Sequence, residues 1–112
     1  MGFGEILRKI FGHPFEGATI ITYCDKPGIA DITGARDFVS RTKAKGIIIL
    51  FSEPPAQKVL NLARETGVEL VSTQLSGKKA VSAFISSQND GENYIFVDIE
   101  RISGRNMSMD PL

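Results

Sequence analysis

The chain has 112 residues, 42% of them hydrophobic, and its 13 basic and 13 acidic residues cancel to a net charge of zero. The length is that of one domain, which we place over residues 1–104, followed by an irregular tail at 105–112. The balanced charge argues against nucleic acid as a partner, and the apolar runs are far shorter than the ~18 residues of a membrane span. The single cysteine, Cys24, excludes an internal disulfide and, with no apolar leader at the N-terminus, favours a cytoplasmic protein.

The first third of the chain predicts a helix, a strand and a second helix. Apolar side chains at helical spacing form one face of the first helix: Phe3, Ile6, Leu7, Ile10 and Phe11. The β-branched and aromatic stretch 18–24 predicts a strand, and the Pro-Gly sequence after it a turn. A helix over 30–42 follows, with Asp31 as its cap and Gly34 as a weak point inside it.

The middle of the chain repeats this alternation of strand and helix. An unbroken apolar run predicts a strand over 45–51. The segment 53–67 predicts a helix in which Pro55 is the first helical residue and Gly67 the C-terminal cap. A third strand is expected over 68–73.

The last part of the chain predicts one more helix and one more strand. The helix covers 76–88 and has Ser76 as its cap. The strand covers 94–100, with alternate apolar side chains on one face, namely Ile95, Val97 and Ile99.

Strands that alternate with helices of this length indicate βαβ units and a parallel sheet. The stretch "GIIILF" (46–51) is apolar on both sides, and such a strand must be covered on both faces. We therefore expect a small three-layer α/β fold: a mostly parallel four-stranded sheet, with helices on both faces and "GIIILF" as a central strand.

Polar side chains gather where the predicted strands end. In an open parallel sheet, ligands bind beyond the carboxyl ends of the strands. We expect a binding site there, made by Thr22, Ser52, Glu53, Thr73, Ser76, Lys78 and Lys79. The two lysines fall in the first turn of a helix with free backbone N–H groups, which would favour a small anion or a nucleotide. The alternative is that both lysines point to solvent.

The residue types indicate no catalytic constellation. His13 is the one histidine and Cys24 the one cysteine, and their spacing does not argue for a catalytic pair. One histidine and one cysteine cannot make a zinc site without several carboxylates. We expect no enzyme, no metal and no cofactor, with a hydrolase that uses Cys24 or Glu53 as an alternative.

Residues 46–84, "GIIILFSEPPAQKVLNLARETGVELVSTQLSGKKAVSAF", resemble a DRTGG domain and are similar to the N-terminal domain of HPr kinase/phosphorylase. The shared features are an apolar strand, then "EPP", "VLNLA", "GVELVST" and a helix of small residues. "YIFVDIERISG" (94–104) is similar to the last strand of the second of these domains. The chain has no Walker loop, so the resemblance does not imply kinase activity. It implies a regulatory or ligand-sensing module, tied in some members to adenine nucleotides.

Residues 20–50 also resemble Mrr-type restriction-endonuclease-like proteins in the order of their strands and helices. The positions that correspond to the catalytic residues of that family do not carry matching residues in this chain. Asp25 and Lys26 are adjacent, so they could not project from the same face of a strand, and Glu16 is the one nearby candidate for the upstream acid. This second resemblance implies a nuclease relative that cannot hold Mg²⁺ properly.

The sequence thus predicts a non-enzymatic regulatory module that senses a ligand or docks on a partner protein, with a nucleotide or another small anion bound at the carboxyl ends of the strands. The alternative is a nuclease-derived, catalytically inactive adaptor associated with nucleic acid. A four-stranded sheet has two edges, which makes a homodimer a further expected partner.

Overall fold

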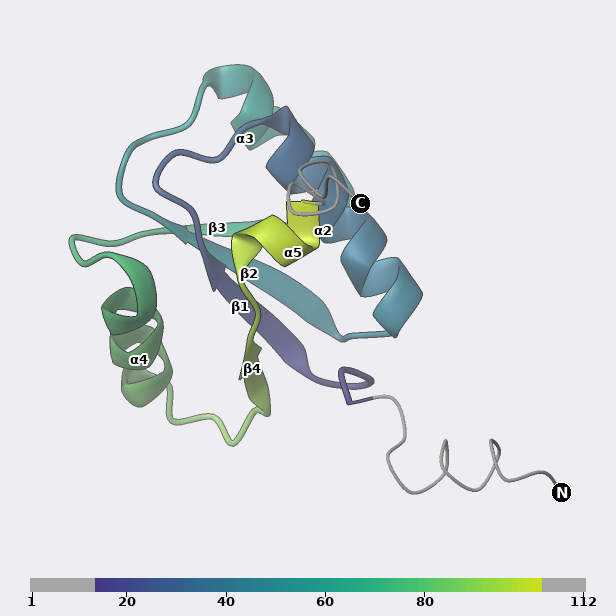
Figure 1. Ribbon diagram of the computed structural model, residues 1–112, viewed down its shortest axis with the longest axis vertical. Helices are drawn as coiled ribbons and strands as arrows, with labels where there is room; N and C mark the ends of the chain where they lie inside the picture. Colours follow the sequence, from purple (N-terminus) through teal and green to yellow (C-terminus); the bar gives the residue numbers. More distant parts are fainter. Residues whose placement is uncertain (1–13, 104–112) are drawn as a thin grey trace, which may run out of the picture.

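The computed structural model describes residues 14–103, in which strands and helices alternate along the chain (Figure 1). The strands are β1 (Thr19–Tyr23), β2 (Gly46–Phe51), β3 (Glu69–Ser72) and β4 (Tyr94–Phe96). The helices are α2 (Ile29–Thr42), α3 (Gln57–Thr66), α4 (Gly77–Ser87) and α5 (Ile99–Ser103). The helix expected over residues 3–11 and the tail expected at 105–112 lie outside the described residues. None of the described helices is long and apolar enough to cross a membrane.

The four strands form one parallel sheet in the order β3-β2-β1-β4. Thr19 in β1 is in register with Gly46 in β2 on one side and with Tyr94 in β4 on the other. The chain therefore moves outward from β1 to β3 and then returns across the sheet to place β4 beside β1. The direction of strand addition reverses between β1 and β4, and this position is the topological switch point of the sheet.

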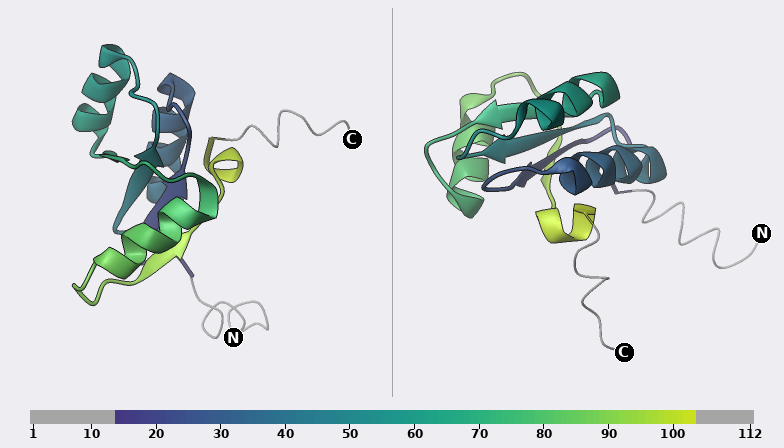
Figure 2. Two further views of the ribbon diagram at one scale, coloured as in Figure 1. Left: turned by 90° about the vertical axis from the view of Figure 1, so that its left-hand side faces the viewer. Right: turned by 90° about the horizontal axis from the view of Figure 1, so that it is seen from above.

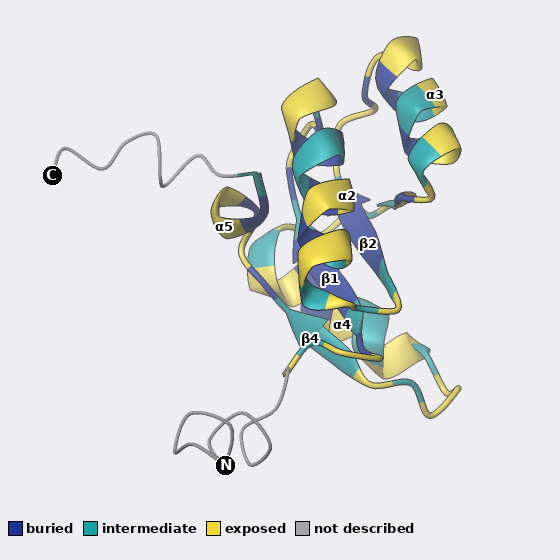
Figure 3. Ribbon diagram, turned by 90° about the vertical axis from the view of Figure 1, so that its right-hand side faces the viewer, coloured by how far each residue is buried: buried dark blue, intermediate teal, exposed yellow. Residues whose placement is uncertain are grey.

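Helices cover both faces of the sheet, which confirms the three-layer α/β fold (Figure 2). Residues of α2, α3 and α5 form one core cluster, in which Ile47 and Ile49 of β2 also take part. Residues of α4 form the second cluster, which includes Ile48 and Leu50 of the same strand. Alternate side chains of β2 are thus buried on opposite faces, and Figure 3 shows β1 and β2 buried between the helix layers. The prediction that "GIIILF" is a central, doubly covered strand is confirmed.

Two helices begin at different residues from those predicted. α2 has Gly28 as its N-cap, and Asp31 lies one turn inside, where its carboxylate accepts the backbone N–H of Gly28 at 2.9 Å. α3 begins at Gln57 after the N-cap Ala56, so Pro55 is not its first residue. The C-terminal cap of α3 is Gly67 with φ 78°, as the sequence predicted.

The last predicted strand is shorter than expected and is followed by a helix. β4 ends at Phe96, and the carbonyl oxygen of Asp98 accepts the amides of Arg101 and Ile102 to open α5. Ile99 therefore packs into the core from a helix instead of from the strand that the alternating pattern predicted.

Gly34 has a packing role that its helix propensity alone does not reveal. α5 crosses α2 at this residue, and a Cβ atom there would lie 2.7 Å from the carbonyl oxygen of Ile102. Only glycine allows the two backbones to approach so closely. The residue that weakens α2 as an isolated helix therefore fixes the position of α5.

Candidate functional site

The carboxyl ends of β1, β2 and β3 lie side by side at one edge of the sheet. The amide of Cys24 donates to the carbonyl oxygen of Leu50 at 2.9 Å, and the amide of Thr73 donates to that of Phe51 at 2.8 Å. Beyond the strands, the carbonyl oxygen of Asp25 accepts the amides of Ser52 at 3.2 Å and of Glu53 at 2.8 Å. The loops that follow β1 and β2 are therefore fixed to each other by backbone hydrogen bonds.

A pocket of about 370 Å³ opens at this edge, between the end of β1 and the start of α5. It is lined by Tyr23, Cys24, Asp25, Lys26, Ile99 and Glu100. Because α5 follows β4, the two walls of the pocket come from the two strands on either side of the switch point. We call this cavity the switch pocket, and open α/β sheets bind their ligands at this position.

The hydroxyl of Tyr23 connects the ends of two strands. It donates to Asp25 Oδ1 at 2.7 Å and lies 2.9 Å from Ser52 Oγ. The hydrogen bond with Ser52 lowers the pKa of Tyr23, but the hydrogen bond to Asp25, partial burial and the charge of Asp25 outweigh it. The net result is a pKa raised above the ordinary value of 10.0. Tyr23 is therefore a neutral hydrogen-bonding group at physiological pH, and it holds the Asp25 carboxylate at the pocket.

Cys24, which lines the switch pocket, belongs to a buried polar pair. Cys24 is 7% exposed, and its thiol lies 3.6 Å from Oδ2 of Asp31, which is 1% exposed. The same carboxylate oxygen accepts the N–H of Gly28. Asp31 thus places a negative charge at the N-terminus of α2, where the helix dipole favours it. The thiol directs its proton toward this carboxylate oxygen.

The predicted site residues do not all lie together in the structure. Ser52 joins the site through Tyr23, and Glu53 is exposed beside it. Thr22 is fully buried in β1, and no group among the described residues pairs with its Oγ1. Its side chain therefore does not reach the rim.

The other four predicted residues follow β3 and do not line the switch pocket. Thr73 uses its Oγ1 to accept the amide of Leu75 at 3.1 Å. Ser76 is the N-cap of α4, without a hydrogen bond from its side chain to the helix. Lys78 and Lys79 are exposed in the first turn of that helix.

The residues that make the walls of the pocket were not among the predicted site residues. Asp25 and Lys26 lie in the loop after β1 and not in a strand, so both can line one cavity. Ile99 and Glu100 belong to α5, which was not predicted because the apolar residues there alternate as in a strand. All four residues follow β1 or β4. This shared position indicates a site only once the strand order is known.

Within residues 14–103, no group of three or more histidine, cysteine or acidic residues could hold a metal ion. Comparison of the chain with protein-family models, with curated proteins and with solved structures gave no match.

Proposed function

We propose that the protein is a non-enzymatic regulatory module that binds an adenine nucleotide of low charge in the switch pocket. The observation that carries the proposal is the position of the pocket, at the carboxyl edge where the strand order reverses. A volume of about 370 Å³ is in the range of small-molecule sites. The resemblance of residues 46–104 to the DRTGG domain supports the regulatory role.

The charges of the pocket favour a ligand with few phosphate groups. Lys26 offers one ammonium group to a phosphate, while Asp25 and Glu100 offer carboxylate oxygens to the hydroxyl groups of a ribose or to an amino group. Two carboxylates and one ammonium repel a triphosphate more than a monophosphate. AMP is therefore the expected ligand class, in preference to ATP.

The buried pair beneath the pocket supports a binding role over a catalytic one. The thiol of Cys24 is 7% exposed and faces the carboxylate of Asp31, whereas reactive cysteines are partly exposed and lie in positive surroundings. Because the carboxylate of Asp31 already occupies the N-terminus of α2, that helix end does not offer a phosphate site. Lys26 is therefore the group that we expect to contact the phosphate.

Isothermal titration with AMP, adenosine and ATP, supported by thermal-shift measurements, tests the proposal. We expect AMP to bind more tightly than ATP. Lys26→Ala should weaken AMP binding about tenfold, equivalent to about 1.4 kcal/mol, and leave adenosine binding nearly unchanged. Glu100→Gln should weaken both ligands, and Lys58→Ala, which removes an exposed lysine on α3, is the control. No heat and no thermal shift with any of the three ligands would refute the proposal.

A further inference from the structure

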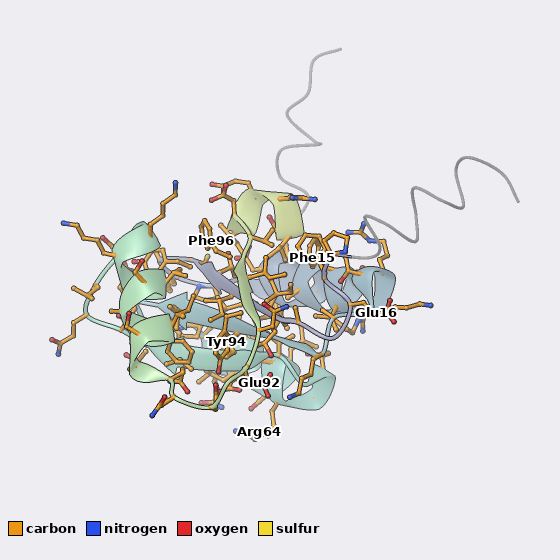
Figure 4. The ribbon with its side chains drawn as sticks, turned by 90° about the horizontal axis from the view of Figure 1, so that it is seen from below. Phe15, Glu16, Arg64, Glu92, Tyr94 and Phe96 are labelled. Carbon is orange, nitrogen blue, oxygen red and sulfur yellow. The ribbon has the colours of Figure 1, made fainter. Side chains whose placement is uncertain are left out.

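A second pocket, of about 410 Å³, lies between α2, α5 and the segment that leads into β1. Two aromatic rings form its apolar part, because Phe15 and Phe38 pack edge to face with their centroids 5.3 Å apart. Figure 4 shows Phe15 beside α5, on the side of the molecule where β1 begins. We call this cavity the arginine pocket, for the two arginines that also line it, Arg41 and Arg101.

The two arginines are held on the faces of these rings. The Cζ atom of Arg41 lies 5.7 Å from the ring centroid of Phe38, and that of Arg101 lies 5.6 Å from the centroid of Phe15. A guanidinium group that stacks on a ring keeps its N–H edge free to bind a carboxylate with two hydrogen bonds. Within residues 14–103, neither arginine forms an ion pair. Both side chains are exposed, so their N–H groups are open to a ligand.

Two carboxylates line the same cavity without pairing with the arginines. They are Asp98, which opens α5, and Glu100 in its first turn. The arginine pocket thus combines an apolar floor with two positive and two negative groups. A ligand with a single kind of charge would be attracted by one pair and repelled by the other. A zwitterion with an apolar body matches all three features.

We propose that the arginine pocket binds a free α-amino acid with an aromatic or large aliphatic side chain. The carboxylate of the ligand binds Arg41 and Arg101, its ammonium group binds Asp98 and Glu100, and its side chain packs on Phe15 and Phe38. The site goes beyond the proposed nucleotide function, because its cavity and its ligand are different. The two pockets share Glu100, so α5 is the element through which they adjoin.

Isothermal titration of the full chain with L-phenylalanine tests this inference, with two analogues that each lack one charge. Phenethylamine has no carboxylate, and N-acetyl-L-phenylalanine has no ammonium group. We expect both analogues to bind at least about tenfold more weakly than L-phenylalanine. Binding of either analogue as tight as that of L-phenylalanine would show that the ligand need not be a zwitterion and would overturn the proposal. No binding of L-phenylalanine or L-leucine up to about 10 mM would also overturn it.

Two arginine variants on α2 locate the ligand, after circular dichroism has shown that both are folded. Arg41→Ala should weaken L-phenylalanine binding at least about tenfold, while Arg36→Ala, whose ion-pair partner is the neighbouring Asp37, should leave it unchanged. Unchanged binding in Arg41→Ala would overturn the proposal. The nucleotide function is tested separately, because Arg41→Ala should retain AMP binding and Lys26→Ala should retain L-phenylalanine binding.

Discussion

Replacing Gly34 with alanine tests how closely α2 and α5 must pack. A Cβ atom at Gly34 would lie 2.7 Å from the carbonyl oxygen of Ile102 and 2.8 Å from the Cα atom of Ser103. Both neighbours are backbone atoms, so α5 must move to make room. Overpacking costs about 1–3 kcal/mol, and two backbone clashes place this variant near the upper end. The higher helix propensity of alanine offsets about 1 kcal/mol. We expect the free energy of unfolding to fall by about 2 kcal/mol.

Urea unfolding followed by far-UV circular dichroism measures this loss. Gly46→Ala is the matched control, because a Cβ atom at that position would meet nothing within 4 Å, and its stability should stay within about 0.5 kcal/mol of the wild type. Because α5 carries Ile99 and Glu100, Gly34→Ala should also weaken AMP binding. A Gly34→Ala protein as stable as the wild type, or more stable, would contradict the close packing of α2 and α5, since helix propensity alone would then govern this position.

Two further predictions concern hydrogen bonds of carboxylates. The hydrogen bond to Asp90 raises the pKa of Tyr94 to about 12, so Asp90→Asn should bring it down toward 10, measured by ultraviolet titration of the two tyrosines of the chain. Because the folded-state pKa of Tyr94 is the higher one, its contribution to stability is complete below pH 10 and is lost as the pH rises through about 12. Asp31→Ala should lower the free energy of unfolding by about 1–3 kcal/mol, because the partly buried amide of Gly28 loses its acceptor. A urea midpoint equal to that of the wild type would contradict that role of Asp31.

The fold could be predicted from the sequence where burial leaves a clear pattern. β2 is apolar at every position from Ile47 to Leu50, and only a strand covered on both faces can bury all four side chains. Gly67 ended α3 as expected because a left-handed C-cap favours glycine. α5 was missed because Val97 and Ile99 alternate as in a strand, although Ile99 and Ile102 also have helical spacing.

The candidate site could be predicted only in part, because it depends on the strand order. Parallel strands place all their carboxyl ends at one edge, and Ser52 lies at that edge beside Tyr23. The sequence does not say which neighbour β4 pairs with. Once β4 lies beside β1, the cavity forms between the end of β1 and the start of α5, away from the first turn of α4 with Lys78 and Lys79.

Chemical-shift mapping with AMP on the isotope-labelled chain tests whether the nucleotide binds in the switch pocket. We expect the amide signals that move to cluster at residues 23–26 and at Ile99 and Glu100, on both walls of the switch pocket. Shifts confined to the first turn of α4, or no shift at saturating AMP, would contradict it.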